Sequence, residues 1–251
     1  MNKNDPQGIT PWDIIVAGAL LTRLPLPKAP KSAFETQAKS VWAFPLIGVL
    51  VAALSSLAGM GVIAFGGSNM IAAGIMLGVA MITTGAMHED GLADCADGFW
   101  GGFDPARRLE IMKDSQIGTY GVLALIVVIG LRWLALSTVI ASGFLGVFAA
   151  AALSRGIMPM MMAMIPHARD HGLSHHVGRP AQTAAVVAFC IASGISFLCL
   201  GFGAIPAILI TILVAFVMAR LAKVKIIGQT GDVLGATQVL AETAILIYLI
   251  A

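Results

Sequence analysis

Three aspartates, Asp90, Asp94 and Asp97, have side-chain types and a spacing that suit metal chemistry. Their i, i+4, i+7 spacing places the carboxylates on one face of a helix, where they repel one another unless a cation lies between them. Oxygen ligands suit Mg²⁺ or Mn²⁺ better than zinc, and Mg²⁺ takes its remaining ligands from water and substrate phosphate. The spacing therefore predicts a divalent-cation site, with a solvated loop between membrane helices as the alternative.

A second polar helix is expected directly after these aspartates. Asp104-Pro105 follows a Gly-Gly turn and is typical of an N-cap with proline in the first helical position. The expected helix and its end carry the charged residues Arg107, Arg108, Glu110, Lys113 and Asp114. This segment would bring cations and a further carboxylate back toward the three aspartates.

The elements that position these residues are expected to lie in a membrane. Of the 251 residues, 58% are hydrophobic and 11% are charged, whereas about a quarter of the residues in a soluble domain are charged. The net charge of +2 is too small, and its cations too scattered, for a nucleic-acid partner.

Seven stretches are long and apolar enough to cross a bilayer. They are residues 42–66, 69–87, 119–141, 143–165, 181–203, 205–221 and 232–250. Residues 12–27 are too short to span, so we expect a re-entrant or interfacial segment there, with an aqueous loop over residues 29–40. The expected fold is all-α: a polytopic helical bundle of about seven transmembrane helices that forms one membrane domain over residues 1–251.

The loop cations indicate how this bundle is oriented. The connections near residues 67, 142 and 204 contain no Lys or Arg, and the loop cations lie in the other connections. The positive-inside rule makes those other connections cytoplasmic. Polar segments at about residues 88–118, 166–180 and 222–232 would then form catalytic loops that open to the cytoplasm.

A glycine-rich segment before the last span is a candidate anion site. Gly231 and Asp232 lie there among further glycines, an amide and a hydroxyl. Backbone N–H groups at a helix N-terminus favour negative charge. An N-cap with a tight turn explains the same residues equally well.

Other ionisable residues allow two readings each. Glu242 lies at membrane depth, either as a functional carboxylate or as a partner of Arg155 or Arg132. His88 is either a general base or an interfacial polar residue. The histidines of residues 167–176 include an i, i+4 pair of the kind that binds zinc, but a glycine interrupts any helix there. A substrate-contacting or plain cytoplasmic loop is therefore expected.

Ordered motifs along the whole chain resemble the adenosylcobalamin 5′-phosphate synthases, also called adenosylcobinamide-GDP ribazoletransferases. The motifs are His88 to Gly98, Leu109 to Ser115, Gly118 to Gly121, Thr22 to Pro25, Phe44 to Gly48, Ser154-Arg155, Ala168-Arg169, Gly172-Leu173 and Gly228 to Ala236. Two positions depart from the family pattern. Glu89 stands where the family usually has leucine, and Asp170-His171 replaces an acidic pair.

The resemblance implies a late step in the assembly of the nucleotide loop of cobalamin, vitamin B12. Adenosylcobinamide-GDP would react with α-ribazole or its 5′-phosphate to give adenosylcobalamin or its 5′-phosphate, with GMP leaving. The resemblance also implies Mg²⁺ as cofactor and a multi-pass transferase in the lipid bilayer of the bacterial cytoplasmic (inner) membrane. The oligomeric state stays open, a homo-oligomer included.

The implied reaction gives each candidate residue a role. Asp90, Asp94 and Asp97 would hold the metal, Asp114 would complete a second metal position, and His88 would be the general base. The candidates for substrate binding are Arg107, Arg108, Asp114, Arg155, Gly231 and Asp232, the arginines through diphosphate oxygens.

Two rival functions would use similar residues. A CDP-alcohol phosphotransferase also holds metal on helical aspartates, but the spacing of its signature differs from Asp90 and Asp94. A secondary transporter would place its carboxylates at mid-depth with repeat symmetry, whereas the carboxylates here cluster in one segment.

Overall fold

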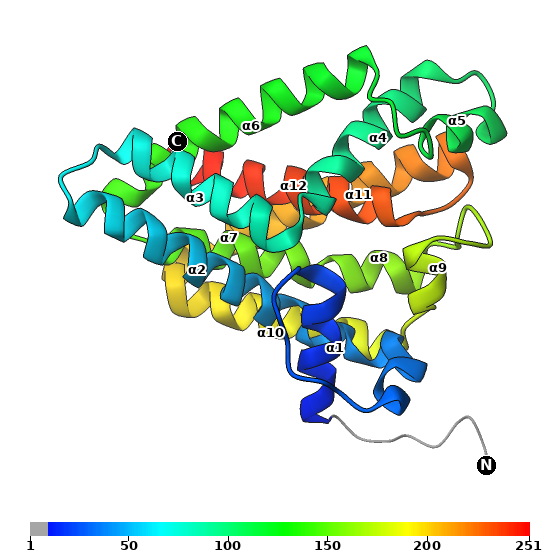
Figure 1. Ribbon diagram of the computed structural model, residues 1–251, viewed down its shortest axis with the longest axis horizontal. Coiled ribbons are helices and arrows are strands. Elements are labelled where there is room, and N and C mark those ends of the chain that lie inside the picture. The colour runs from blue at the N-terminus through cyan, green and yellow to red at the C-terminus, as the bar shows by residue number, and fades with distance from the viewer. Residues whose placement is uncertain (1–9) are drawn as a thin grey trace.

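The protein is helical throughout the part of the chain that the structure describes. The computed structural model describes residues 10–251 (Figure 1). In chain order the elements are α1 (Pro11–Leu21), η1 (Lys31–Ala43), α2 (Phe44–Ala64), α3 (Asn69–Thr84), α4 (Met87–Gly101), α5 (Pro105–Ile111), α6 (Thr119–Val139), η2 (Ile140–Ser142), α7 (Leu145–Gly156), α8 (Met158–Met164), α9 (Leu173–Val177), α10 (Gln182–Leu200), η3 (Gly201–Gly203), α11 (Ala204–Ile226) and α12 (Gly231–Tyr248). The predicted all-α class is confirmed.

Several of these helices are long and apolar enough to cross a membrane. Within the described residues there are four such stretches, Lys31–Ala64, Thr119–Ser142, Leu145–Met164 and Gln182–Ile226, and a fifth if α3 and α4 count as one bent pair. The chain is therefore an integral membrane protein. The longest stretch contains both α10 and α11, joined at η3.

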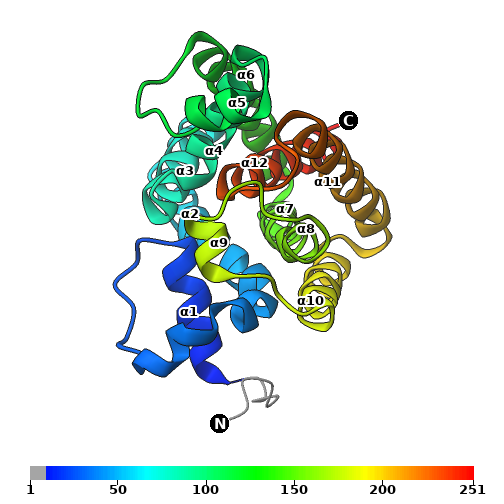
Figure 2. The same ribbon diagram turned by 90° about the vertical axis from the view of Figure 1, so that its right-hand side faces the viewer.

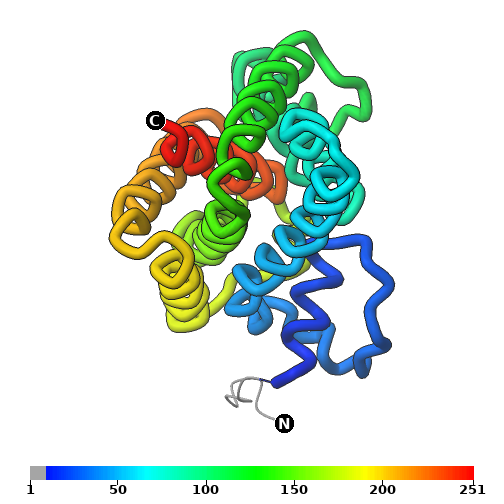
Figure 3. Tube along the Cα trace, turned by 90° about the vertical axis from the view of Figure 1, so that its left-hand side faces the viewer, coloured from blue at the N-terminus to red at the C-terminus, as the bar shows by residue number. Residues whose placement is uncertain are grey.

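The N-terminal segment differs in part from its prediction. Residues 29–40 were expected to form an aqueous loop, but Lys31–Ala43 form the 3-10 helix η1, with a break at Thr36. The indole Nε1 of Trp42 donates a hydrogen bond of 2.9 Å to Asp13 Oδ2, which ties this helix to the 11-residue α1. Figure 3 shows the α1–η1 segment beside α2, at one side of the bundle.

The last helix, α12, lies at the centre of the bundle. Figure 2 shows it surrounded by α4, α7 and α11, and most of its residues are buried. Two glycines allow α4 and α12 to touch. A Cβ added at Gly91 would lie 2.7 Å from the backbone oxygen of Asp232, and one added at Gly235 would lie 3.2 Å from His88 Cα. This close approach brings the start of α12 against the helix that carries the aspartates.

Buried ion pairs join α12 to three neighbouring helices. Arg132 of α6 donates to Glu89 of α4 at 2.8 Å and to Glu242 of α12 at 2.7 Å. Arg155 of α7 lies 3.2 Å from the other oxygen of Glu242. The sequence left open whether Glu242 pairs with Arg155 or Arg132, and in the structure it pairs with both. These charges hold α4, α6, α7 and α12 in register.

Candidate active site

The three aspartates lie on α4, as their spacing predicts, but they differ in exposure. The chain bends by 88° between α3 and α4, through Gly85 and Ala86, which both have positive φ. Along α4, Asp90 is exposed, Asp94 is half-buried and Asp97 is buried. The carboxylates therefore descend from the surface toward the contact with α6 and α12.

Asp97 holds the start of α6. Its two carboxylate oxygens accept hydrogen bonds from Gly118 N at 2.7 Å and from Gly121 N at 2.9 Å. Both glycines are needed for this approach, because a Cβ at either position would lie within 2.5 Å of an Asp97 oxygen. Predicted as a metal ligand, Asp97 thus also satisfies N–H groups that a helix N-terminus leaves free.

Asp232 joins the aspartates of α4 from the opposite helix. Its carboxylate is within electrostatic range of Asp94 and Asp90. Arg169 Nη2 donates to Asp232 Oδ2 at 2.9 Å, and the hydroxyl of Thr230 donates to the same oxygen at 3.1 Å. Asp94 and Asp232 thus meet where α4 crosses the first turn of α12.

The loop that contains residues 166–174 is hydrogen-bonded to the loop that precedes α12. Backbone hydrogen bonds run from Ala168 N to Gln229 O at 2.9 Å and from Gln229 N to Pro166 O at 2.8 Å. The side chain of Gln229 also accepts from Ser174 Oγ at 2.9 Å. This pairing places Arg169 beside the start of α12, where Thr230 is the N-cap and accepts from Val233 N.

His167 belongs to the same junction. Its Nδ1 lies 3.0 Å from the amide Nε2 of Gln229, which can only donate, so Nδ1 is the acceptor. Partial burial, His175 and Arg179 lower the pKa of His167 below its usual value. The ring is therefore neutral near pH 7.

The short helix after the aspartates forms as predicted and supports the site from outside. Asp104 caps α5 by accepting from Arg107 N at 3.0 Å. The guanidinium of Arg108 donates to the backbone oxygens of Gly102 and Lys225 at 2.9 and 3.0 Å, which fastens α5 to the ends of α4 and α11. Asp114, predicted to complete a second metal position, is exposed and accepts from Gln116 N of its own loop.

The predicted phosphate-binding arginines divide into two groups. Arg107 is exposed and pairs with Glu110 on the surface of α5 at 3.0 Å. Arg155 lies inside the bundle with its side chain only 4% exposed and paired with Glu242. The structure thus gives Arg155 a partner within the protein, and Arg107 is the one that faces outward.

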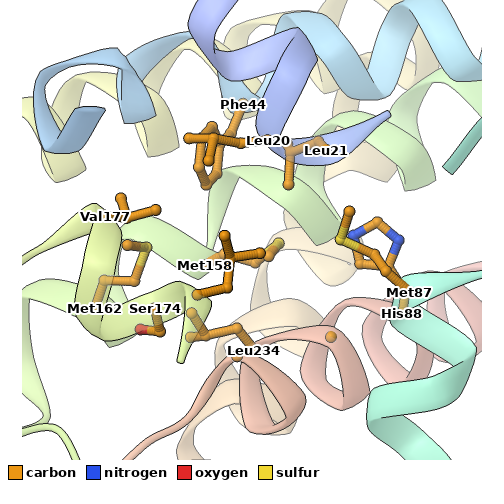
Figure 4. A pocket seen from close by; sticks show the side chains of 13 residues that line it. Leu20, Leu21, Phe44, Met87, His88, Met158, Met162, Ser174, Val177 and Leu234 are labelled. Atoms are coloured by element: carbon orange, nitrogen blue, oxygen red, sulfur yellow. The ribbon is translucent and has the colours of Figure 1, made fainter. Parts of the chain in front are cut away.

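His88 faces a small cavity of about 50 Å³ (Figure 4). Side chains of α1, α2, α8, α9 and α12 line the cavity and most are apolar, among them Leu20, Phe44, Met158 and Leu234. The residue is 2% exposed, and its Nε2 has no hydrogen-bond partner among residues 10–251. Gly231 and Ser174 form part of the same wall.

The oxygen donors at the meeting of α4 and α12 suit a hard divalent cation. Among residues 10–251, no group of three or more Asp, Glu, His or Cys side chains is placed so that it could hold a metal ion. Mg²⁺ does not require three protein ligands, because it usually binds through one or two carboxylates and takes its other ligands from water and substrate phosphates. Asp94 and Asp232 offer two such carboxylates, and Asp90 lies one turn from Asp94 on α4.

The sequence patterns gave Arg169 and Gln229 no role in the site. Both lie in motifs of the expected cytoplasmic loops, but nothing in their spacing shows that residues 166–172 and 228–232 pair. The residue types did contain one indication of a nearby cation. Asp232 is a carboxylate in a segment otherwise suited to anions, and a partly buried carboxylate needs a positive partner.

Comparison with known proteins identifies what the chain resembles. Residues 13–250 match the family described as cobalamin-5-phosphate synthase. An adenosylcobinamide-GDP ribazoletransferase of Bradyrhizobium diazoefficiens is 39% identical, over 94% of this chain and 92% of its own length. The enzyme of the same name from Azorhizobium caulinodans is 38% identical and covers 93% of both chains. No solved structure matches.

Proposed function

The chain belongs to the cobalamin-5-phosphate synthase family, and from this premise we propose how its residues carry out the reaction. Its activity is that of an adenosylcobinamide-GDP ribazoletransferase of vitamin B12 biosynthesis. In the proposed reaction a ribose hydroxyl of α-ribazole, or of its 5′-phosphate, attacks the phosphorus next to the cobinamide. A new P–O bond forms, the bond to GMP breaks, and the hydroxyl proton is released.

The observation that carries this proposal is the meeting of Asp94 with Asp232 and Arg169. Carboxylates from α4 and α12 are within electrostatic range of each other, and the guanidinium of Arg169 pairs with Asp232. Cleavage of a diphosphate bond is favoured by such groups. The oxygens of the breaking bond gain negative charge, and a cation stabilises that charge.

We propose that Asp90, Asp94 and Asp232 hold Mg²⁺ and that Asp97 supports them by fixing α6 against α4. When bound, the ion would stabilise charge on the diphosphate oxygens. Arg107, exposed beside the site, would contact the diphosphate of the donor, and Arg108 would keep α5 in place for that contact. A ligand role for Asp114 would require its loop to turn toward α4.

The proposed membrane arrangement keeps the seven spans expected from the sequence, with α4 outside them. The 88° bend after α3 supports this, since α4 leaves the direction of the span at the point where the charged residues begin. Residues 88–118, 166–180 and 222–232 would then face the cytoplasm. Burial and the carboxylates of Asp232, Asp90 and Asp97 raise the pKa of Asp94 to about 7, and a bound cation would relieve that repulsion.

The direct test is GMP release from adenosylcobinamide-GDP by the full chain purified in detergent. We expect release that requires both Mg²⁺ and α-ribazole or its 5′-phosphate, and that stops with EDTA. Asp94→Asn should slow it by about a hundredfold or more, while Asp170→Asn, a change of the same kind in an exposed loop residue, should leave it intact. Release that continues in EDTA would refute the metal assignment.

A further inference from the structure

A groove lies between α8, α10 and α11, and none of the proposed site residues lines it. Its volume is about 430 Å³, within the range of about 300–1,000 Å³ usual for small-molecule sites. Figure 2 shows α10 and α11 side by side at the edge of the bundle, with α8 on their inner side. All three helices belong to stretches that are apolar enough to cross a membrane. The groove is therefore within reach of the lipid bilayer.

The walls of the groove are apolar over most of their length. On α11 the lining residues recur at helical spacing, and the small side chains of Ala215 and Ala219 alternate with the larger ones of Ile212 and Phe216. The side of α11 is open, since Phe216 is 61% exposed and Ile212 is 45% exposed. Opposite them, α8 contributes three methionines, whose flexible side chains adapt to different shapes. The groove thus suits a flexible hydrocarbon chain.

Two cations line one end of the groove. Arg220 and Lys223 lie in the last two turns of α11, and both are exposed. Neither forms an ion pair within residues 10–251. Their i, i+3 spacing places them on one face of the helix. Guanidinium and ammonium groups bind phosphate oxygens, so this end of the groove suits a phosphate.

An anionic phospholipid has both of these features in the same order. Its phosphate lies at the bilayer surface, and its acyl chains extend from there into the apolar interior. In the groove, the apolar wall extends from Arg220 toward the middle of α11, and Ile212 lies about 12 Å farther along the helix. Basic pockets between transmembrane helices on the cytoplasmic side bind anionic head groups. The end of α11 is expected on that side from its loop cations.

We propose that this groove binds one anionic phospholipid of the surrounding membrane. Its phosphate would lie on Arg220 and Lys223, and one acyl chain would lie along Ala215 and Ala219. The bound lipid would fill the space that α8, α10 and α11 leave between them. The proposal is independent of the proposed function, because the groove shares no residue with the candidate active site.

Titration of the full chain in detergent, followed by native mass spectrometry, measures the Kd of each bound lipid. Phosphatidylglycerol is compared with phosphatidylcholine of the same acyl chains, so that only the head group differs. The double variant Arg220→Gln and Lys223→Gln removes the cations, and Lys31→Gln, at an exposed position of η1, is its control. Ala219→Phe fills the groove. Val217→Phe is its control, because Val217 is 46% exposed on the same helix and does not line the groove.

We expect one phosphatidylglycerol to bind, and to bind at least tenfold more tightly than phosphatidylcholine. Each cation that is removed should weaken its binding about fivefold. Ala219→Phe should weaken the binding of both lipids about tenfold, and the two controls should match wild type.

Equal affinity of the wild type for both lipids, or unchanged phosphatidylglycerol binding in the double variant, would overturn the proposal. Lipid that is displaced by adenosylcobinamide-GDP, or lost when two chains associate, would give the groove another occupant and would also overturn it. If Ala219→Phe does not fold, the double variant on the exposed end of α11 decides the question.

Discussion

At the scale of single residues, the site depends on which partner each charged side chain has. Asp232 accepts hydrogen bonds from Arg169 and Thr230, and Asp97 accepts them from the backbone of α6. Within residues 10–251, the side chains of Asp90 and Asp94 accept none. Of the four carboxylates, Asp90 and Asp94 are thus the most available to a ligand. The aspartates of α4 therefore differ in role, because each has different neighbours in the folded protein.

The neutral state of His167 predicts a dependence of stability on pH. Because its pKa is lowered in the folded protein, the unfolded chain binds the proton more readily, below about pH 6.5. Stability should be constant above that value, fall as the pH drops through it, and level off below the folded pKa.

Unfolding in a denaturing detergent, followed between pH 5 and 8, measures this effect. His167→Gln should flatten the fall, since glutamine does not titrate, whereas His171→Gln, a change in the same loop, should keep it. An unchanged slope in His167→Gln would contradict the assignment.

At the scale of elements, the hydrogen bonds that Asp97 accepts are expected to stabilise the contact between α4 and α6. Asp97→Ala leaves two N–H groups at the start of α6 without their acceptor. Loss of such a cap costs typically about 1 kcal/mol and up to about 2 kcal/mol. We expect Asp97→Ala to lower the free energy of unfolding by that amount and Asp90→Ala, at an exposed position of α4, to leave it nearly unchanged. Equal stability of the two variants would show that Asp97 does not anchor α6.

The sequence predicted the elements better than their contacts. The i, i+4, i+7 spacing placed the aspartates on one helix and Asp104-Pro105 marked the start of α5, and both predictions are confirmed. The segment before the last span does contain an N-cap, Thr230, as one of its two readings expected. These signals are local, within one or two helical turns. The pairing of Gln229 with Ala168 is not, because it joins loops about sixty residues apart and depends on how α11 returns the chain. Residues 29–40 were predicted as a loop because their composition is polar. The helix there is supported by a contact between distant residues, the hydrogen bond from Trp42 to Asp13.

At the scale of the whole molecule, the buried charges on α4, α6, α7 and α12 link the core to the site. Glu89 and Glu242 together neutralise Arg132 and Arg155. Glu89 is adjacent to His88 and one residue from Asp90, so the network fixes the helix that carries the aspartates. This position gives the buried Glu89 carboxylate a partner in Arg132.

Glu242→Gln tests that link. The change removes one charge from a buried set and leaves an arginine uncompensated, which typically costs about 3–5 kcal/mol. Glu110→Gln breaks an ion pair whose side chains are 63% and 65% exposed, where such pairs are worth about 0–1 kcal/mol. Free energies of unfolding in detergent compare the two. A Glu242→Gln protein as stable as Glu110→Gln would show that the network does not hold the bundle together.

The central claim is that Asp94 and Asp232, 138 positions apart in the printed chain, belong to one catalytic site. Initial rates of GMP release by Asp94→Asn, Asp232→Asn and the double variant test it most directly. Residues that act as one unit are strongly non-additive. If the two aspartates form one site, each single change lowers the rate by about a hundredfold or more, and the double variant is no slower than the worse single one. Losses that multiply in the double variant would instead place the two aspartates in independent roles.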